Sequence, residues 1–113
     1  MTDLSSTDLG TAINKLSATI DARSGADPKQ SYTSKLLHDG VAHCAKKLGE
    51  EAVELVIAST SGDAQETSKE AADVLYHLLV VLKAAGVNPA DVAAVLAERE
   101  KQSGLEEKAS RPK

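Results

Sequence analysis

Two long stretches of helical periodicity, joined by a short turn, constrain the fold of this 113-residue chain more than any other feature. Apolar residues recur at helical spacing over 41–59 and again over 63–85. Ser61 and Gly62 form a turn between the two stretches, and Asp63 with Glu66 has capping-box spacing at the start of the second. Two long helices joined by a tight turn pack as antiparallel neighbours, which is the core of a helical bundle.

Shorter helices are predicted on both sides of this pair. One follows the cap candidates at 5–8 and ends in the loop at 24–28, and another spans 31–37 and closes at Gly40. Asn88 and Pro89 open a last helix that runs to about Gln102. We therefore predict an all-α fold, an antiparallel helical bundle of about four to five helices. The whole chain, 1–113, forms a single domain, and 104–113 is a polar, loosely held tail.

Composition and charge limit the kinds of molecule that this chain can bind and the compartment in which it works. The chain has no Trp or Phe and only two Tyr, so its core buries modest area per residue, and pairing with a second copy as a homodimer would complete that burial. The formal net charge of −4 argues against nucleic-acid binding. No apolar run approaches the length that spans a membrane, and the N-terminus lacks a signal-peptide pattern. The single cysteine excludes a disulfide framework. We expect a cytoplasmic protein.

Each long helix carries a narrow strip of acids. On a helical wheel Glu51 and Glu54 lie about 60° apart, with Glu50 beside Glu54. In the second helix one strip, also about 60° wide, holds an acid every turn and then a histidine: Glu66, Glu70, Asp73 and His77. A solvated face is usually broad and carries charges of both signs, whereas these strips are bordered by apolar residues. The pattern predicts that the strips face a crevice.

On antiparallel neighbours the strips bring together four carboxylates, those of Glu51, Glu54, Glu70 and Asp73. Crowded like charges repel one another, and burial raises the cost further. A hard divalent cation relieves both, and oxygen ligands suit Mg²⁺ or Mn²⁺ better than Zn²⁺. The alternative interpretation is an ordinary solvated acidic face without a metal.

Glu51-x-x-Glu54 and Glu70-x-x-Asp73, with fifteen residues between the pairs, resemble the acidic signature of the all-α nucleotide pyrophosphohydrolases of the MazG type. The longer segments 31–40, 46–54 and 70–79 closely resemble the phosphoribosyl-ATP pyrophosphatase family, and 103–111 is similar to the tail of some bacterial members. The resemblance covers nearly the whole chain in the order expected of that family.

This resemblance implies hydrolysis of 1-(5-phosphoribosyl)-ATP to 1-(5-phosphoribosyl)-AMP and pyrophosphate, the second step of histidine biosynthesis. It implies a bundle completed by dimerisation, with Mg²⁺ held by Glu51, Glu54, Glu70 and Asp73. One of these carboxylates, or Glu50, would act as the base for the attacking water. The residues expected to contact substrate phosphate or to support the site are Ser31, Thr33, Lys35, Lys46, Lys47 and His77. Plain helix capping, charge balance and a hydrogen-bonded structural histidine are the alternatives at these positions.

Two other functions stay as alternatives, and a third, a di-iron bundle, fits the sequence poorly. A housecleaning pyrophosphohydrolase for nucleoside triphosphates would keep the same four acids. A di-iron bundle needs a Glu-x-x-His motif on each of two helices, whereas His77 follows Asp73 by four residues. A non-catalytic helical interaction module would be stabilised by Glu70→Gln and would not respond to Mg²⁺.

Overall fold

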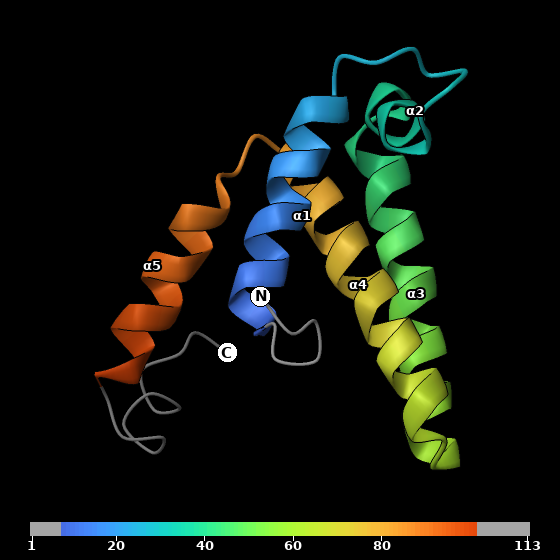
Figure 1. Ribbon diagram of the computed structural model, residues 1–113, viewed down its shortest axis with the longest axis vertical. Coiled ribbons are helices and arrows are strands. Elements are labelled where there is room, and N and C mark those ends of the chain that lie inside the picture. The colour runs from blue at the N-terminus through green and yellow to red at the C-terminus, as the bar shows by residue number, and fades with distance from the viewer. Residues whose placement is uncertain (1–7, 102–113) are drawn as a thin grey trace, which may run out of the picture.

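The computed structural model describes residues 8–101, which form five α-helices and no strand (Figure 1). The helices are α1 (Leu9–Arg23), α2 (Tyr32–Asp39), α3 (Val41–Ser61), α4 (Ala64–Ala84) and α5 (Pro89–Glu100). The predicted all-α fold is confirmed, and α3 runs two residues beyond its predicted end at Ser59. The predicted tail, 104–113, lies outside the described residues.

Local capping explains why the helices begin where the sequence predicts. The side chain of Asp8 accepts a hydrogen bond from the backbone N–H of Thr11 at 2.7 Å, at the start of α1. Asp63 accepts from the N–H of Glu66 at 3.0 Å, at the start of α4. Such side-chain oxygens satisfy backbone donors that have no partner in the first helical turn. Asn88 plays the same part for α5, with Pro89 in the first turn.

Each of the two long helices ends at a glycine, and the first of these glycines allows the tight connection between them. Gly62 has a φ of 82°, in the left-handed region, which lets the chain leave α3 and enter α4 almost at once. Gly86, with a φ of 73°, ends α4, and the N–H of Val87 donates to the carbonyl oxygen of Leu82 at 2.9 Å. The short connection at Gly62 makes α3 and α4 antiparallel neighbours (Figure 1).

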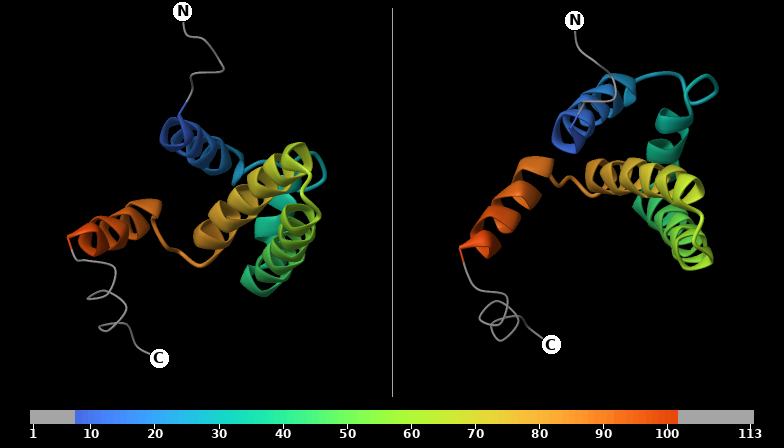
Figure 2. Two further views of the ribbon diagram at one scale, coloured as in Figure 1. Left: turned by 90° about the horizontal axis from the view of Figure 1, so that it is seen from below. Right: turned by 60° about the horizontal axis from the view of Figure 1, so that its bottom comes forward.

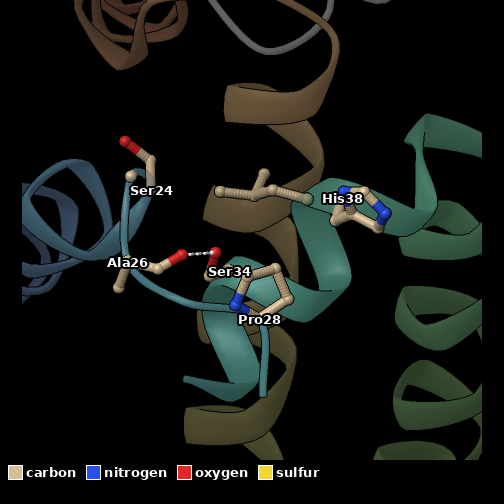
Figure 3. A pocket seen from close by; sticks show the side chains of 7 residues that line it. Ser24, Ala26, Pro28, Ser34 and His38 are labelled. Carbon is tan, nitrogen blue, oxygen red and sulfur yellow. Dashed lines mark hydrogen bonds between the residues drawn. The ribbon is translucent and has the colours of Figure 1, made fainter. Parts of the chain in front are cut away.

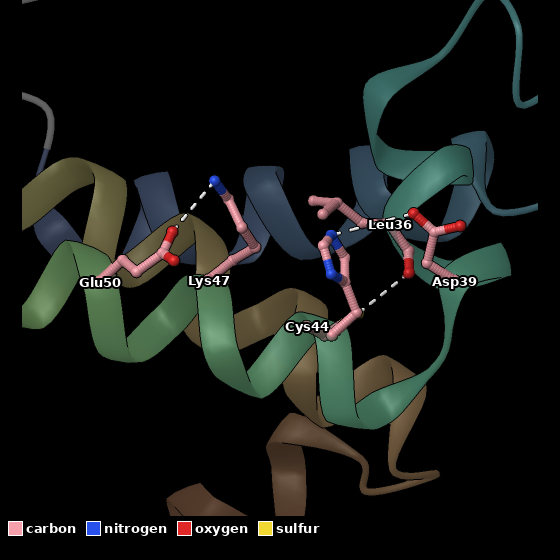
Figure 4. Close-up of polar contacts among 6 residues, drawn as sticks. Leu36, Asp39, Cys44, Lys47 and Glu50 are labelled. Atoms are coloured by element: carbon pink, nitrogen blue, oxygen red, sulfur yellow. Dashed lines mark hydrogen bonds and ion pairs between the residues drawn. The ribbon is translucent and has the colours of Figure 1, made fainter.

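The buried core lies where α1, α2 and the last half of α4 meet the start of α3. Its members come from all four helices: Ile20, Leu36, Cys44, Leu79 and Val80. The Cys44 thiol is fully buried and donates to the carbonyl oxygen of Leu36 at 3.1 Å (Figure 4). Burial raises the pKa of this thiol, and Cys44 serves as a small core residue.

Two apolar strips remain open to solvent. On α3, Val53, Val56 and Ile57 are 56–60% exposed although the sequence places them on the apolar half of that helix. On α5 no residue is buried, and Val92, Val95 and Leu96 share one face at i, i+3, i+4 spacing. Figure 2 shows α5 standing apart from the α3–α4 pair. The single chain therefore leaves part of its apolar surface uncovered.

Among the described residues, no helix taken alone has the length and hydropathy required to cross a membrane. Helices α4 and α5 taken together pass that test by length and composition only, and they are bent by 113° at the break between them.

Candidate functional site

Three carboxylates meet between α3 and α4. Glu51 on α3 and Glu70 with Asp73 on α4 each offer one oxygen, and these oxygens all lie within 4.8 Å of one another. Glu51 and Glu70 are half-buried, whereas Asp73 is exposed. The meeting follows from the hairpin, because Glu70 and Asp73 are three residues apart on the face of α4 that is turned toward Glu51. The acidic strips therefore converge rather than point separately into solvent.

The carboxylates of this cluster have no ion-pair partner in the part of the chain that the structure describes. Within residues 8–101 no lysine or arginine forms an ion pair with Glu51, Glu70 or Asp73. The Oε2 atom of Glu70 is buried and has no hydrogen-bond partner there. Burial, followed by the charges of Glu51 and Asp73, raises the pKa of Glu70. An unpaired buried oxygen among carboxylates of one sign fits a hard cation with oxygen ligands.

Glu54 and Glu50 lie outside this group. The structure brings together three of the four predicted carboxylates and leaves Glu54 exposed on α3. Glu54 lies about 60° around the helix from Glu51, yet its charge still contributes to raising the pKa of Glu70 on α4. Glu50 is also exposed, and its Oε1 atom forms an ion pair with Nζ of Lys47 at 3.3 Å (Figure 4).

His77 continues the acidic strip into the protein. It lies one turn beyond Asp73 on α4, is only 6% exposed, and its Nδ1 atom has no hydrogen-bond partner among the described residues. Its ring packs edge-on against Tyr76 at a centroid distance of 5.0 Å and against Tyr32 at 6.3 Å. Burial lowers the pKa of His77, against the opposing charges of nearby acids, so the imidazole is neutral at pH 7.

This lowered pKa of His77 makes fold stability depend on pH. Between the folded-state pKa and the ordinary value near 6.5, the unfolded chain binds more protons than the folded one. The stability from neutral His77 is therefore complete above about pH 6.5 and is lost as the pH falls below it. Urea unfolding measures the drop in unfolding free energy between pH 7.5 and pH 5.5. We expect this drop to be larger for wild type than for His77→Gln. His38→Gln, at an exposed position on α2, is the matched control. Equal losses in wild type and His77→Gln would contradict this account.

The predicted phosphate-binding hydroxyls are engaged within the protein. Ser31 is the N-cap of α2, and its Oγ atom accepts from the N–H of Ser34 at 3.2 Å. Thr33 is 3% exposed, and its hydroxyl shares a hydrogen bond of 2.6 Å with the hydroxyl of Tyr76 on α4. The Thr33 hydroxyl therefore faces the core, where its hydrogen bond links α2 to α4.

The predicted lysines differ in their surroundings. Lys35 and Lys46 are exposed, whereas Lys47 is half-buried beside Glu50. The hydrogen bond and charge of Glu50 raise the pKa of Lys47, with smaller contributions from Tyr32 and Glu51. Lys47 therefore keeps its positive charge, one helical turn before Glu51 on α3.

An open pocket lies elsewhere, between the α1–α2 connection and α2 (Figure 3). Its lining is small and mostly neutral: Ser24, Gly25, Ala26, Pro28, Ser34, Leu37 and His38. The Ser34 hydroxyl donates to the carbonyl oxygen of Ala26 across it. None of the predicted site residues lines this pocket, so it is separate from the carboxylate cluster.

Comparison with known proteins places these features in a family. Residues 13–100 match the family model described as phosphoribosyl-ATP pyrophosphohydrolase. The chain is 54% identical over 99 residues to phosphoribosyl-ATP pyrophosphatase 1 of Rhodopseudomonas palustris, covering 88% of this chain and 92% of the relative. It is 54% identical over 101 residues to the phosphoribosyl-ATP pyrophosphatase of Cereibacter sphaeroides, covering 89% and 98%. A relative from Bradyrhizobium diazoefficiens, phosphoribosyl-ATP pyrophosphatase 1, is 56% identical over 99 residues, covering 88% and 93%. Because the family model matches residues 13–100 and these relatives are more than 50% identical over most of both chains, the chain belongs to the phosphoribosyl-ATP pyrophosphohydrolase family.

Proposed function

We propose that this protein hydrolyses 1-(5-phosphoribosyl)-ATP with one water to 1-(5-phosphoribosyl)-AMP and pyrophosphate, the second step of histidine biosynthesis. The observation that carries the proposal is the cluster of Glu51, Glu70 and Asp73, with its buried unpaired oxygen, in a chain of this family. The cluster is the feature that a triphosphate-cleaving site requires and that an interaction module has no use for.

The proposed cofactor is Mg²⁺, held by Glu51, Glu70 and Asp73. A triphosphate and a group of carboxylates repel each other, and a bound Mg²⁺ would supply the charge neutralisation and Lewis-acid polarisation that bring them together. Glu54, exposed one turn along α3, is the proposed fourth ligand, because a change of side-chain rotamer would turn its carboxylate toward the group. The all-oxygen donor set accepts Mn²⁺ as well.

The remaining roles fall to residues around the cluster. Glu50, Glu51, Glu54, Glu70 and Asp73 are the proposed candidates for the base that takes the proton from water. We place phosphate contacts on the capped start of α2 and on three lysines: Lys35, Lys46 and Lys47. Neutral His77 would offer a hydrogen bond to a carboxylate or to substrate. We expect the reaction in the cytoplasm, with no nucleic-acid or membrane partner.

A pyrophosphate-release assay tests the activity and its metal together. Phosphoribosyl-ATP, ATP and deoxynucleoside triphosphates are compared with Mg²⁺, with Mn²⁺, and with EDTA. We expect release from phosphoribosyl-ATP alone, lost in EDTA and restored by excess Mg²⁺ or Mn²⁺. Comparable turnover of ATP or deoxynucleotides would favour the housecleaning function. No release from any substrate, with melting unchanged by Mg²⁺, would favour the interaction module.

We also propose that two copies pair through the apolar strip of α3. Val53, Val56 and Ile57 share one face and each leaves more than half of its side chain in water. Fully burying one such side chain contributes roughly 1.5–3 kcal/mol, so covering the exposed halves of three is worth about 3 kcal/mol per copy. A homodimer would complete the bundle that the single chain leaves open.

A further inference from the structure

We infer that Tyr32 is the platform on which the nucleobase of the substrate stacks, and so a substrate-binding residue of the site; this inference rests on the proposed hydrolysis of phosphoribosyl-ATP. Tyr32 lies at the start of α2 and is 54% exposed. The chain contains two tyrosines and no Phe or Trp. Since Tyr76 is packed against the core, Tyr32 is the ring with a face open to a ligand.

The ring of Tyr32 packs against two other rings, those of Tyr76 and His77. It stacks on Tyr76 at a centroid distance of 6.4 Å and an interplanar angle of 18°, and it meets His77 edge-on at 6.3 Å. Tyr76 is itself fixed by its hydrogen bond to Thr33, and His77 is buried. One side of the Tyr32 ring therefore has rigid support while the rest faces solvent, which is the arrangement of a preorganised stacking surface.

The Tyr32 ring lies within the reach of a nucleotide whose phosphates bind at the carboxylates. His77 follows Asp73 by one helical turn, about 6 Å along α4, and the Tyr32 ring lies one further step of 6.3 Å away. On the facing helix Lys47 precedes Glu51 by one turn. The pKa of Lys47 is raised chiefly by Glu50 and more weakly by both Tyr32 and Glu51.

The Tyr32 ring is therefore linked to the carboxylates through His77 by two steps of about 6 Å each. A nucleotide spans a separation of this order, since its ribose separates the 5′-phosphates from the base. With the triphosphate at the carboxylates, the purine would be within reach of the Tyr32 ring. Base–aromatic stacking is tolerant of base identity but requires a flat ring, so an aliphatic side chain cannot replace it.

The test compares Tyr32→Leu with Tyr32→Phe in full-length protein with Mg²⁺. For phosphoribosyl-ATP we expect Tyr32→Leu to raise KM about tenfold with a smaller change in kcat, and Tyr32→Phe to stay within about twofold of wild type. Inorganic tripolyphosphate, which has no base, is the control ligand: its inhibition constant should be the same in all three proteins. Circular dichroism and light scattering check that both variants keep the wild-type fold and mass.

Each other outcome overturns the inference in a recognisable way. An unchanged KM in Tyr32→Leu would show that the ring does not contact the base. An equal loss in Tyr32→Phe would assign the effect to the hydroxyl instead of the ring face. A raised KM accompanied by a changed molecular mass would make Tyr32 an interface residue. Failure of the proposed function looks different, because wild type itself would then release no pyrophosphate from phosphoribosyl-ATP.

Discussion

Replacing Glu70 with Gln is expected to abolish pyrophosphate release while leaving the protein helical. Glu70 is the member of the cluster whose Oε2 atom is buried without a partner, and it lies close to both Glu51 and Asp73. Loss of its charge removes one of the proposed metal ligands. The bound cation would otherwise contribute several kcal/mol of transition-state stabilisation. We expect kcat/KM to fall on the order of 10³-fold or more in the release assay.

The same substitution is expected to separate charge repulsion from metal binding. Without divalent cations Glu70→Gln should melt at a higher temperature than wild type, because it relieves the repulsion that raises the pKa of Glu70. Mg²⁺ at ten times its Kd should stabilise wild type by about 1.4 kcal/mol, roughly 5 °C in Tm, and should leave the variant unchanged. An interaction module would show the first effect without any response of wild type to Mg²⁺.

Matched variants sharpen this test. Glu66→Gln makes the same chemical change on the same helix at an exposed position outside the group, and it should keep both turnover and the response to Mg²⁺. Asp73→Asn should repeat the loss seen with Glu70→Gln. Glu54→Gln should lose turnover if its carboxylate joins the other three when metal is bound. Undiminished turnover in Glu70→Gln or Asp73→Asn would contradict the proposed site.

Ile57→Glu is expected to convert a homodimer into a monomer. Ile57 is 56% exposed on the α3 strip, and a carboxylate there would have to be buried without a partner in the paired state. Light scattering at micromolar concentration should show the mass falling by half, and the variant should melt several degrees lower. The wild-type Tm should rise with protein concentration, as for any fold linked to association.

Leu9→Glu is the matched control for this substitution. Leu9 is 63% exposed on α1, outside both apolar strips, so the same change of an exposed apolar residue to Glu should leave the mass unchanged. A wild-type protein that is monomeric at micromolar concentration would rule out the proposed pairing. An Ile57→Glu variant that keeps the wild-type mass would place the contact elsewhere.

The sequence by itself determined the helices and the hairpin. Asp8, Asp63 and Asn88 act on backbone groups two or three residues away, and Gly62 and Gly86 meet a local demand for positive φ. Signals of this range can be read without knowing the fold. The convergence of the acidic strips was equally predictable, because a tight turn leaves two long helices little choice but to pack side by side.

Only the tertiary structure decided what covers each face. The helical wheel placed Glu54 near Glu51 and made Val53, Val56 and Ile57 look like core, yet the structure leaves all four exposed. The hydroxyl of Thr33 meets that of Tyr76, 43 residues away, and Tyr32 stays open beside buried His77. Periodicity tells which residues share a face. The rotation of a helix about its own axis, and hence the neighbour of that face, depends on side-chain packing between segments far apart in sequence.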